Sequence, residues 1–203
     1  MMKLGAGILA LVILAAVSPA FAEEWGDGID SQTVALDRVG RWDWGVLGGG
    51  AFNGDFGDAG YIQTQLAYGL TPWIAVGAEA GYQENDGGDF NDENIGVVPV
   101  MADVIVRVPT LNKRVVPYGV AGIGAIGAWV KDEDGDAPDN NGDDVDDTTF
   151  GWKIGAGADW FFHPNYIAYI EAAYFQGYND LEGSSVDDVG FGMFGAGIKY
   201  VNY

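Results

Sequence analysis

Seven charged side chains stand at alternate positions inside stretches that are otherwise apolar or rich in glycine. Paired carboxylates can serve as general acid and base in catalysis. Here, however, four acids accompany three bases without a nucleophile, and charges in an apolar surrounding have to be paired. The pattern therefore predicts an ion-pair network inside the fold, and no enzyme, with the members Glu79, Asp103, Arg107, Lys153, Asp159, Glu171 and Lys199.

An acidic run over residues 132–147, DEDGDAPDNNGDDVDD, has the chemistry of a calcium loop. Oxygen-bearing side chains at alternate positions, with glycines for tight turns, are what Ca²⁺ coordination uses. No window has the spacing of an EF-hand, so the run favours a solvated acidic loop with weak divalent-cation binding at most. No cofactor is expected apart from weakly bound Ca²⁺, whose expected contributors are Asp132, Asp134, Asp136, Asp143 and Asp144.

Two glycine-rich segments, residues 122–127 and 190–195, match the spacing G-x-G-x-x-G. A dinucleotide site needs that spacing between a strand and a following helix, and neither segment leaves room for such a helix. The glycines are better explained by close backbone approach inside a narrow barrel. The single histidine, His163, precedes a proline and is interpreted as a turn residue.

Composition limits the class of protein. Thirty acidic residues against nine basic ones give a net charge of −21 over 203 residues, which argues against nucleic-acid binding. The absence of cysteine excludes disulfides and thiolate metal sites. The 33 glycines and 13% aromatic residues are atypical of a disordered acidic chain and favour β-structure with polar loops.

The first 22 residues have the pattern of a secretory signal. Lys3 precedes an apolar stretch over residues 4–17, and an A-x-A site ends at Ala22. A short membrane anchor is the alternative, but the apolar stretch is shorter than the roughly 20 residues that span a bilayer. We expect cleavage before Glu23, a short periplasmic leader over residues 23–40, and a barrel domain over residues 41–203.

Strands and polar breaks alternate along the barrel domain. The first, third, fifth and seventh breaks, together with Glu84, contain twenty of the thirty acids and one base, while the others are short turns. Odd and even connections of an antiparallel meander lie at opposite ends, and long outer loops with short periplasmic turns are typical of outer-membrane barrels. Strands are predicted near residues 42–52, 60–70, 73–84, 96–108, 115–130, 149–162, 166–178 and 190–202.

Three predicted strands, over residues 73–83, 98–108 and 150–162, have one apolar face and an opposite face that carries glycines or charges. A barrel of about eight strands has an interior only just wide enough for side chains, so we expect the glycine-rich face inward and the apolar face against lipid. Aromatic residues near the strand ends are predicted to form two membrane-interface girdles. Tyr118 belongs to the expected turn-end girdle, and Tyr61 and Phe191 belong to the loop-end girdle.

Three segments carry a family resemblance: residues 117–124 (PYGVAGIG), 150–160 (FGWKIGAGADW) and 195–200 (GAGIKY). They resemble the small outer-membrane barrel proteins of the OmpA, OmpX and opacity-protein kind, over about residues 41–203. The resemblance implies an all-β, eight-stranded antiparallel up-and-down transmembrane β-barrel in the bacterial outer membrane. It also implies contact with outer-membrane lipid and insertion by the barrel-assembly machinery.

The end of the chain departs from the family pattern, which places two aromatic residues two positions apart. Tyr200 and Tyr203 are three apart. Either a bulge lies near Asn202, or Tyr200 is the last outward aromatic residue.

We expect a plugged lumen and a structural or surface-interaction role through acidic extracellular loops, with an extracellular partner that the sequence leaves open. One alternative is a narrow, porin-like channel for small or apolar molecules, which single-channel conductance would reveal. A second alternative is a secreted soluble barrel that binds a ligand inside, which would need no detergent.

Overall fold

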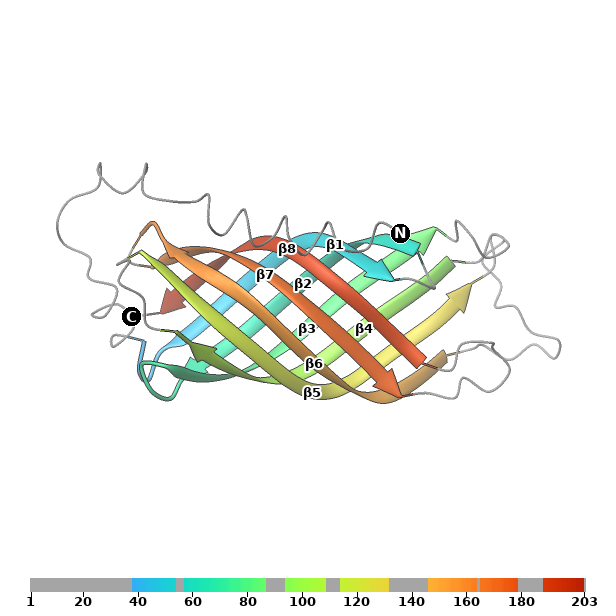
Figure 1. Ribbon diagram of the computed structural model, residues 1–203, viewed down its shortest axis with the longest axis horizontal. Helices are drawn as coiled ribbons and strands as arrows, with labels where there is room; N and C mark the ends of the chain where they lie inside the picture. Colours follow the sequence, from blue (N-terminus) through green and yellow to red (C-terminus); the bar gives the residue numbers. More distant parts are fainter. Residues whose placement is uncertain are drawn as a thin grey trace.

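The computed structural model describes residues 38–53, 57–86, 94–108, 114–131, 146–163, 165–178 and 188–202. Every strand pairs antiparallel with its neighbour in sequence, and the first also pairs with the last, so the sheet closes into a barrel (Figure 1). This confirms the predicted eight-stranded up-and-down barrel. The strands are β1 (Trp42–Asn53), β2 (Gly57–Gly69), β3 (Ile74–Asp86), β4 (Asn94–Arg107), β5 (Val115–Lys131), β6 (Asp146–Phe161), β7 (Tyr166–Tyr178) and β8 (Asp188–Asn202).

The alternation of side chains decides which face of each strand meets the lumen. In β4, Val100 and Val104 are about half exposed on the outside, whereas their neighbours Met101 and Ile105 are buried inside. Outward apolar side chains such as Ile123 remain exposed on the outer face, as expected for a barrel that lipid surrounds. No helix in the described part of the chain is long and apolar enough to cross a membrane.

The short connections lie at one end of the barrel, on the left in Figure 1, beside the end of β8. In the turn between β2 and β3, the Thr71 hydroxyl accepts hydrogen bonds from the backbone N–H groups of Trp73 and Ile74, at 3.2 and 2.9 Å. We call this the turn end and the opposite one the loop end.

At the loop end the strands extend past their predicted limits. Asp86 pairs with Asn94, and Tyr178 pairs with Asp188. The sequence predicted that β3 ends at residue 84 and that β8 begins at residue 190. Backbone hydrogen bonds between strands need no apolar side chains, so the ladders continue into acidic sequence.

The last strand is regular. The β1–β8 register runs without interruption from Phe52 opposite Gly192 to Trp42 opposite Asn202, so the expected alternative of a bulge near Asn202 is wrong. Tyr200 points outward with its ring centroid 5.4 Å from that of Tyr166, and it is the last outward aromatic residue of the described chain.

The lumen contains large apolar side chains that the sequence analysis placed outside. Tyr61, Tyr118 and Phe191, expected in the girdles, are buried inside the barrel, and that assignment was wrong for these three. Inner-face glycines make room for them, because a Cβ at Gly81 would collide with the Tyr61 ring and one at Gly157 with the Tyr118 ring.

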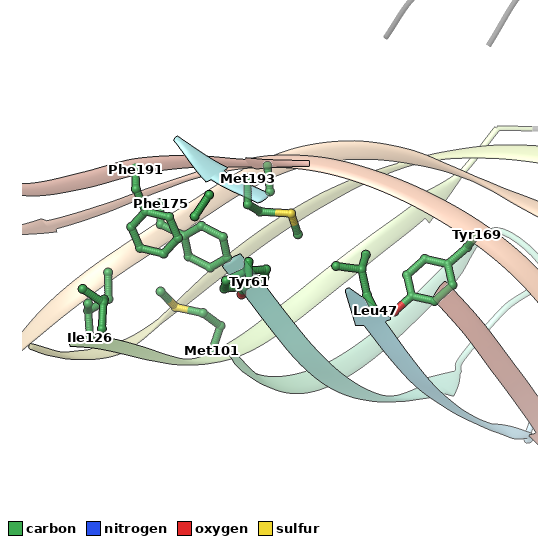
Figure 2. Close-up of a cluster of buried hydrophobic side chains, with 11 residues drawn as sticks. Leu47, Tyr61, Met101, Ile126, Tyr169, Phe175, Phe191 and Met193 are labelled. Carbon is green, nitrogen blue, oxygen red and sulfur yellow. The ribbon is translucent and has the colours of Figure 1, made fainter. Parts of the chain in front are cut away.

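Toward the loop end, Tyr61 and Phe191 join a cluster that we call the apolar plug (Figure 2). Phe175 and Phe191 stack with ring centroids 4.7 Å apart and planes within 9°. Tyr61 packs about equally close to both rings, at 6.3 and 6.2 Å. The buried members of the cluster are Leu47, Ala51, Tyr61, Val97, Met101, Ile126, Tyr169, Ala173, Phe175, Phe191 and Met193.

Candidate functional site

The middle of the lumen contains an ion-pair cluster centred on Lys153. Its ammonium lies 2.6 Å from Glu79 Oε2 and 2.7 Å from Glu171 Oε1. The other Glu171 oxygen accepts a hydrogen bond from the Tyr118 hydroxyl at 2.8 Å. These groups come from β6, β3, β7 and β5, so the contacts tie strands across the barrel. With Asp103 of β4 they form what we call the Lys153 cluster.

A second cluster, centred on Asp159, lies toward the turn end. Arg38 Nη1 approaches Asp159 Oδ2 and Lys199 Nζ approaches Asp159 Oδ1, both at 2.9 Å. Asp43 forms ion pairs with Arg38 and, at 3.0 Å, with Arg107 Nη2. All five side chains are buried. We call Arg38, Asp43, Arg107, Asp159 and Lys199 the Asp159 cluster.

Lys199 is also held by aromatic rings. Its ammonium lies 4.6 Å from the Tyr118 ring centroid and 4.1 Å from that of Tyr169. Such distances are within the range of cation–π attraction, which grows when the cation is desolvated. Lys199 therefore combines an ion pair with a two-ring cage.

Arg38 enters the lumen from a turn that precedes β1. The Arg41 N–H donates to the Arg38 carbonyl at 3.2 Å, and Gly40 adopts the left-handed conformation, φ +75°, that glycine accepts most readily. Gly69 of β2 anchors the turn, since it accepts from Gly40 N–H at 2.8 Å and donates to the Arg41 carbonyl at 3.0 Å. The Arg38 guanidinium lies 5.5 Å above the Phe161 ring.

The structure places all seven predicted network residues in the lumen, each buried. Asp103 makes no ion pair within the described residues, whereas the other six do. The expected calcium contributors, Asp132, Asp134, Asp136, Asp143 and Asp144, lie outside the described residues. Within the described ranges, no group of three or more acids or histidines has the arrangement of a metal site.

Sequence reasoning missed two members of the Asp159 cluster. Asp43 stands between Trp42 and Trp44, so the alternation that was applied to later strands would have turned it inward. Arg38 lies before the first strand, in the segment assigned to the leader. No alternating pattern in that segment indicates which way its side chain points. Residues 23–37 of that expected leader lie outside the described residues.

Comparison with known proteins places these features in context. The family profile described as "Outer membrane protein beta-barrel domain" matches residues 7–201. No curated protein matches the sequence. Three solved structures are similar to this chain at 18% sequence identity or less, so the similarity concerns the fold alone.

The N-terminal β-barrel domain of OprF from Pseudomonas aeruginosa is 18% identical, with 81% of this chain and 98% of that chain covered and a TM-score of 0.53. Neisserial surface protein A is 16% identical, with 79% and 95% covered and a TM-score of 0.59. OprG, an outer membrane protein of P. aeruginosa, is 11% identical, with 83% and 99% covered and a TM-score of 0.53.

Proposed function

This chain belongs to the outer membrane protein β-barrel domain family, and from that premise we propose that it is a plugged barrel with a structural or surface-interaction role. It lies in the bacterial outer membrane, in contact with lipid. The observation that carries the proposal is that three groups of buried side chains lie inside the lumen. The apolar plug, the Lys153 cluster and the Asp159 cluster follow one another from the loop end to the turn end.

Two features support a closed lumen. The ionic side chains of both clusters are at most 5% exposed, so a permeating ion would have to separate buried pairs. At the turn end, a further apolar group packs beneath the Asp159 cluster, formed by Val116, Phe161, Ile167 and Val201. Breaking a buried ion pair is strongly unfavourable because it leaves an uncompensated charge.

The outer surface distinguishes the membrane barrel from the soluble barrel considered above. Ile123, Ile154 and Ile198 are more than half exposed on strands β5, β6 and β8. A contiguous apolar surface of this kind marks contact with a membrane or partner. Because the chain lies in the outer membrane, the soluble alternative is not retained.

We also propose a non-catalytic role. Glu79, Asp159 and Glu171 are engaged by lysine or arginine, and a carboxylate held this way is poorly placed to exchange protons with a substrate. In this proposal the barrel-assembly machinery inserts the barrel, which serves as a membrane-embedded frame. The acidic loops that the barrel presents carry the surface interaction.

Conductance tests the plug directly. The full-length protein in planar lipid bilayers should give no stable single-channel steps, because the proposed plug closes the lumen. An open porin in the same bilayers provides the positive control for insertion and recording. Steady conductance by the unmodified protein would instead support the narrow-channel alternative.

The acidic loops should attract divalent cations at the extracellular rim. Twenty carboxylates are distributed over the loops and their flanking strands. They repel one another, and physiological salt screens this repulsion only beyond about 8 Å. We expect weak Ca²⁺ binding with a Kd of about 10⁻⁴–10⁻³ M, the range of extracellular calcium modules. Calorimetric titration should show heat that is lost on deletion of residues 132–147. Equal heats from both proteins would assign this loop to solvation alone.

A further inference from the structure

Two acids of the Lys153 cluster differ sharply in how their oxygens are satisfied. Glu171 binds the Lys153 ammonium with one oxygen and the Tyr118 hydroxyl with the other. Asp103 is only 3% exposed, yet neither of its carboxyl oxygens has a hydrogen-bond partner among the described residues. A buried carboxylate without partners is strongly unfavourable, so Asp103 needs an explanation that Glu171 does not.

The charges of the lumen do not balance if every acid is ionised. Five acids and four bases are buried among the described residues. The Asp159 cluster has two acids and three bases, so the excess of acid falls on the Lys153 cluster, where three acids surround one lysine. Over the whole lumen one carboxyl group therefore lacks a counter-charge, and it belongs to the Lys153 cluster.

The strand register places Asp103 close to its neighbours in the cluster. Asp103 and Lys153 flank Gly122 in one row across β4, β5 and β6. A Cβ at Gly122 would collide with Asp103 Oδ1, so the carboxyl group lies over this glycine. Glu79 is diagonal to Asp103 on β3, since Gly77 is the direct partner of Asp103, and long side chains reach across such diagonals.

Two more polar atoms beside Asp103 are buried without partners. Glu79 Oε2 binds Lys153 and Gln63, but Glu79 Oε1 is unpartnered among the described residues. Gln65, directly opposite Glu79 on β2, is 3% exposed, and its amide nitrogen is also unpartnered there. The amide can donate to a carboxyl oxygen, but two carboxyl groups can bond to each other only through a proton.

We infer that the Glu79–Asp103 pair is a proton-binding site, occupied by one proton at neutral pH. Asp103 carries the proton and donates a hydrogen bond to Glu79 Oε1. The Gln65 amide donates a hydrogen bond to the remaining Asp103 oxygen. Two carboxyl groups that share a site commonly hold one proton between them. With this proton the lumen carries four negative and four positive charges.

The groups that face the pair come from every strand around it. β2 contributes Tyr61, Gln63 and Gln65, β5 contributes Gly122, β6 contributes Lys153, and β7 contributes Tyr169 and Glu171. Lys153 is the one cation among them, and Glu79 and Glu171 already bind it. The inference goes beyond the proposed function, because it holds whether or not the barrel conducts.

Infrared spectroscopy of the full-length protein in detergent micelles tests the proton directly. At neutral pH the unmodified barrel should show the C=O stretch of a protonated carboxyl group. The band should vanish in Asp103→Asn, shift in Glu79→Gln and persist in Glu171→Gln. Absence of the band from the unmodified protein would overturn the proposal, as would its persistence unchanged in Asp103→Asn.

Denaturant unfolding of the same variants gives a second readout with a matched control, since each change replaces one buried carboxyl group by its amide. The unfolding midpoint of Asp103→Asn should equal or exceed that of the unmodified protein. The midpoint of Glu171→Gln should fall, because this change removes a charge that Lys153 needs. Equal falls in both variants would mean that Asp103 is an ionised member of the cluster, against the proposal.

Discussion

Replacement of Lys153 by methionine is expected to lower the free energy of unfolding by about 3–5 kcal/mol, as the loss of one partner from a buried ion pair does. The Lys153 side chain is fully buried and binds Glu79 and Glu171 at 2.6 and 2.7 Å. Methionine nearly preserves the volume, so the loss reflects charge rather than a cavity. Denaturant unfolding in micelles, followed by tryptophan fluorescence, measures the change.

A double variant separates charge from packing. Lys153→Met combined with Glu171→Gln removes one cation and one anion together, so it should be less destabilised than the sum of the two single variants. Contacting residues show coupling of about 0.5–3 kcal/mol in such cycles. A loss from Lys153→Met below about 1 kcal/mol, the size typical of exposed ion pairs, would show that water reaches the cluster.

The sequence predicted the barrel well because its signals are local and repeated. In β3, Ile74 and Val76 on the apolar face lie outside, and Glu79 on the face of glycines and charges lies inside, as the alternation predicted. Each strand reports its own faces through a period of two. The number of strands, their order and their orientation then follow from short and long connections that alternate.

The contents of the lumen were harder to predict because they depend on partners across the barrel. Tyr61 lies inside because Gly81 on the neighbouring strand leaves space for its ring, a relation that one strand does not report. Arg38 belongs to no strand, and its position depends on the turn at Gly40 and on the acids it meets.

Phe175→Ala is expected to destabilise the barrel by about 3–5 kcal/mol, the usual loss when a buried phenylalanine is truncated and a cavity remains. Phe175 has no exposed surface and lies in one row with Lys153 and Phe191. Its ring stacks on Phe191 and lies 5.4 Å from the Lys153 ammonium. Truncation therefore opens the apolar plug and uncovers the Lys153 cluster beneath it.

Phe150→Ala supplies the matched control, because the same atoms are removed from the outside of the barrel. Phe150 is 60% exposed on β6, where detergent or lipid fills the space left by the ring and no internal cavity forms. Its loss of unfolding free energy should be well below that of Phe175→Ala in the same micelles. Equal losses would mean that the lumen around Phe175 is as open to its surroundings as the outer surface, which would contradict a closed plug at the loop end.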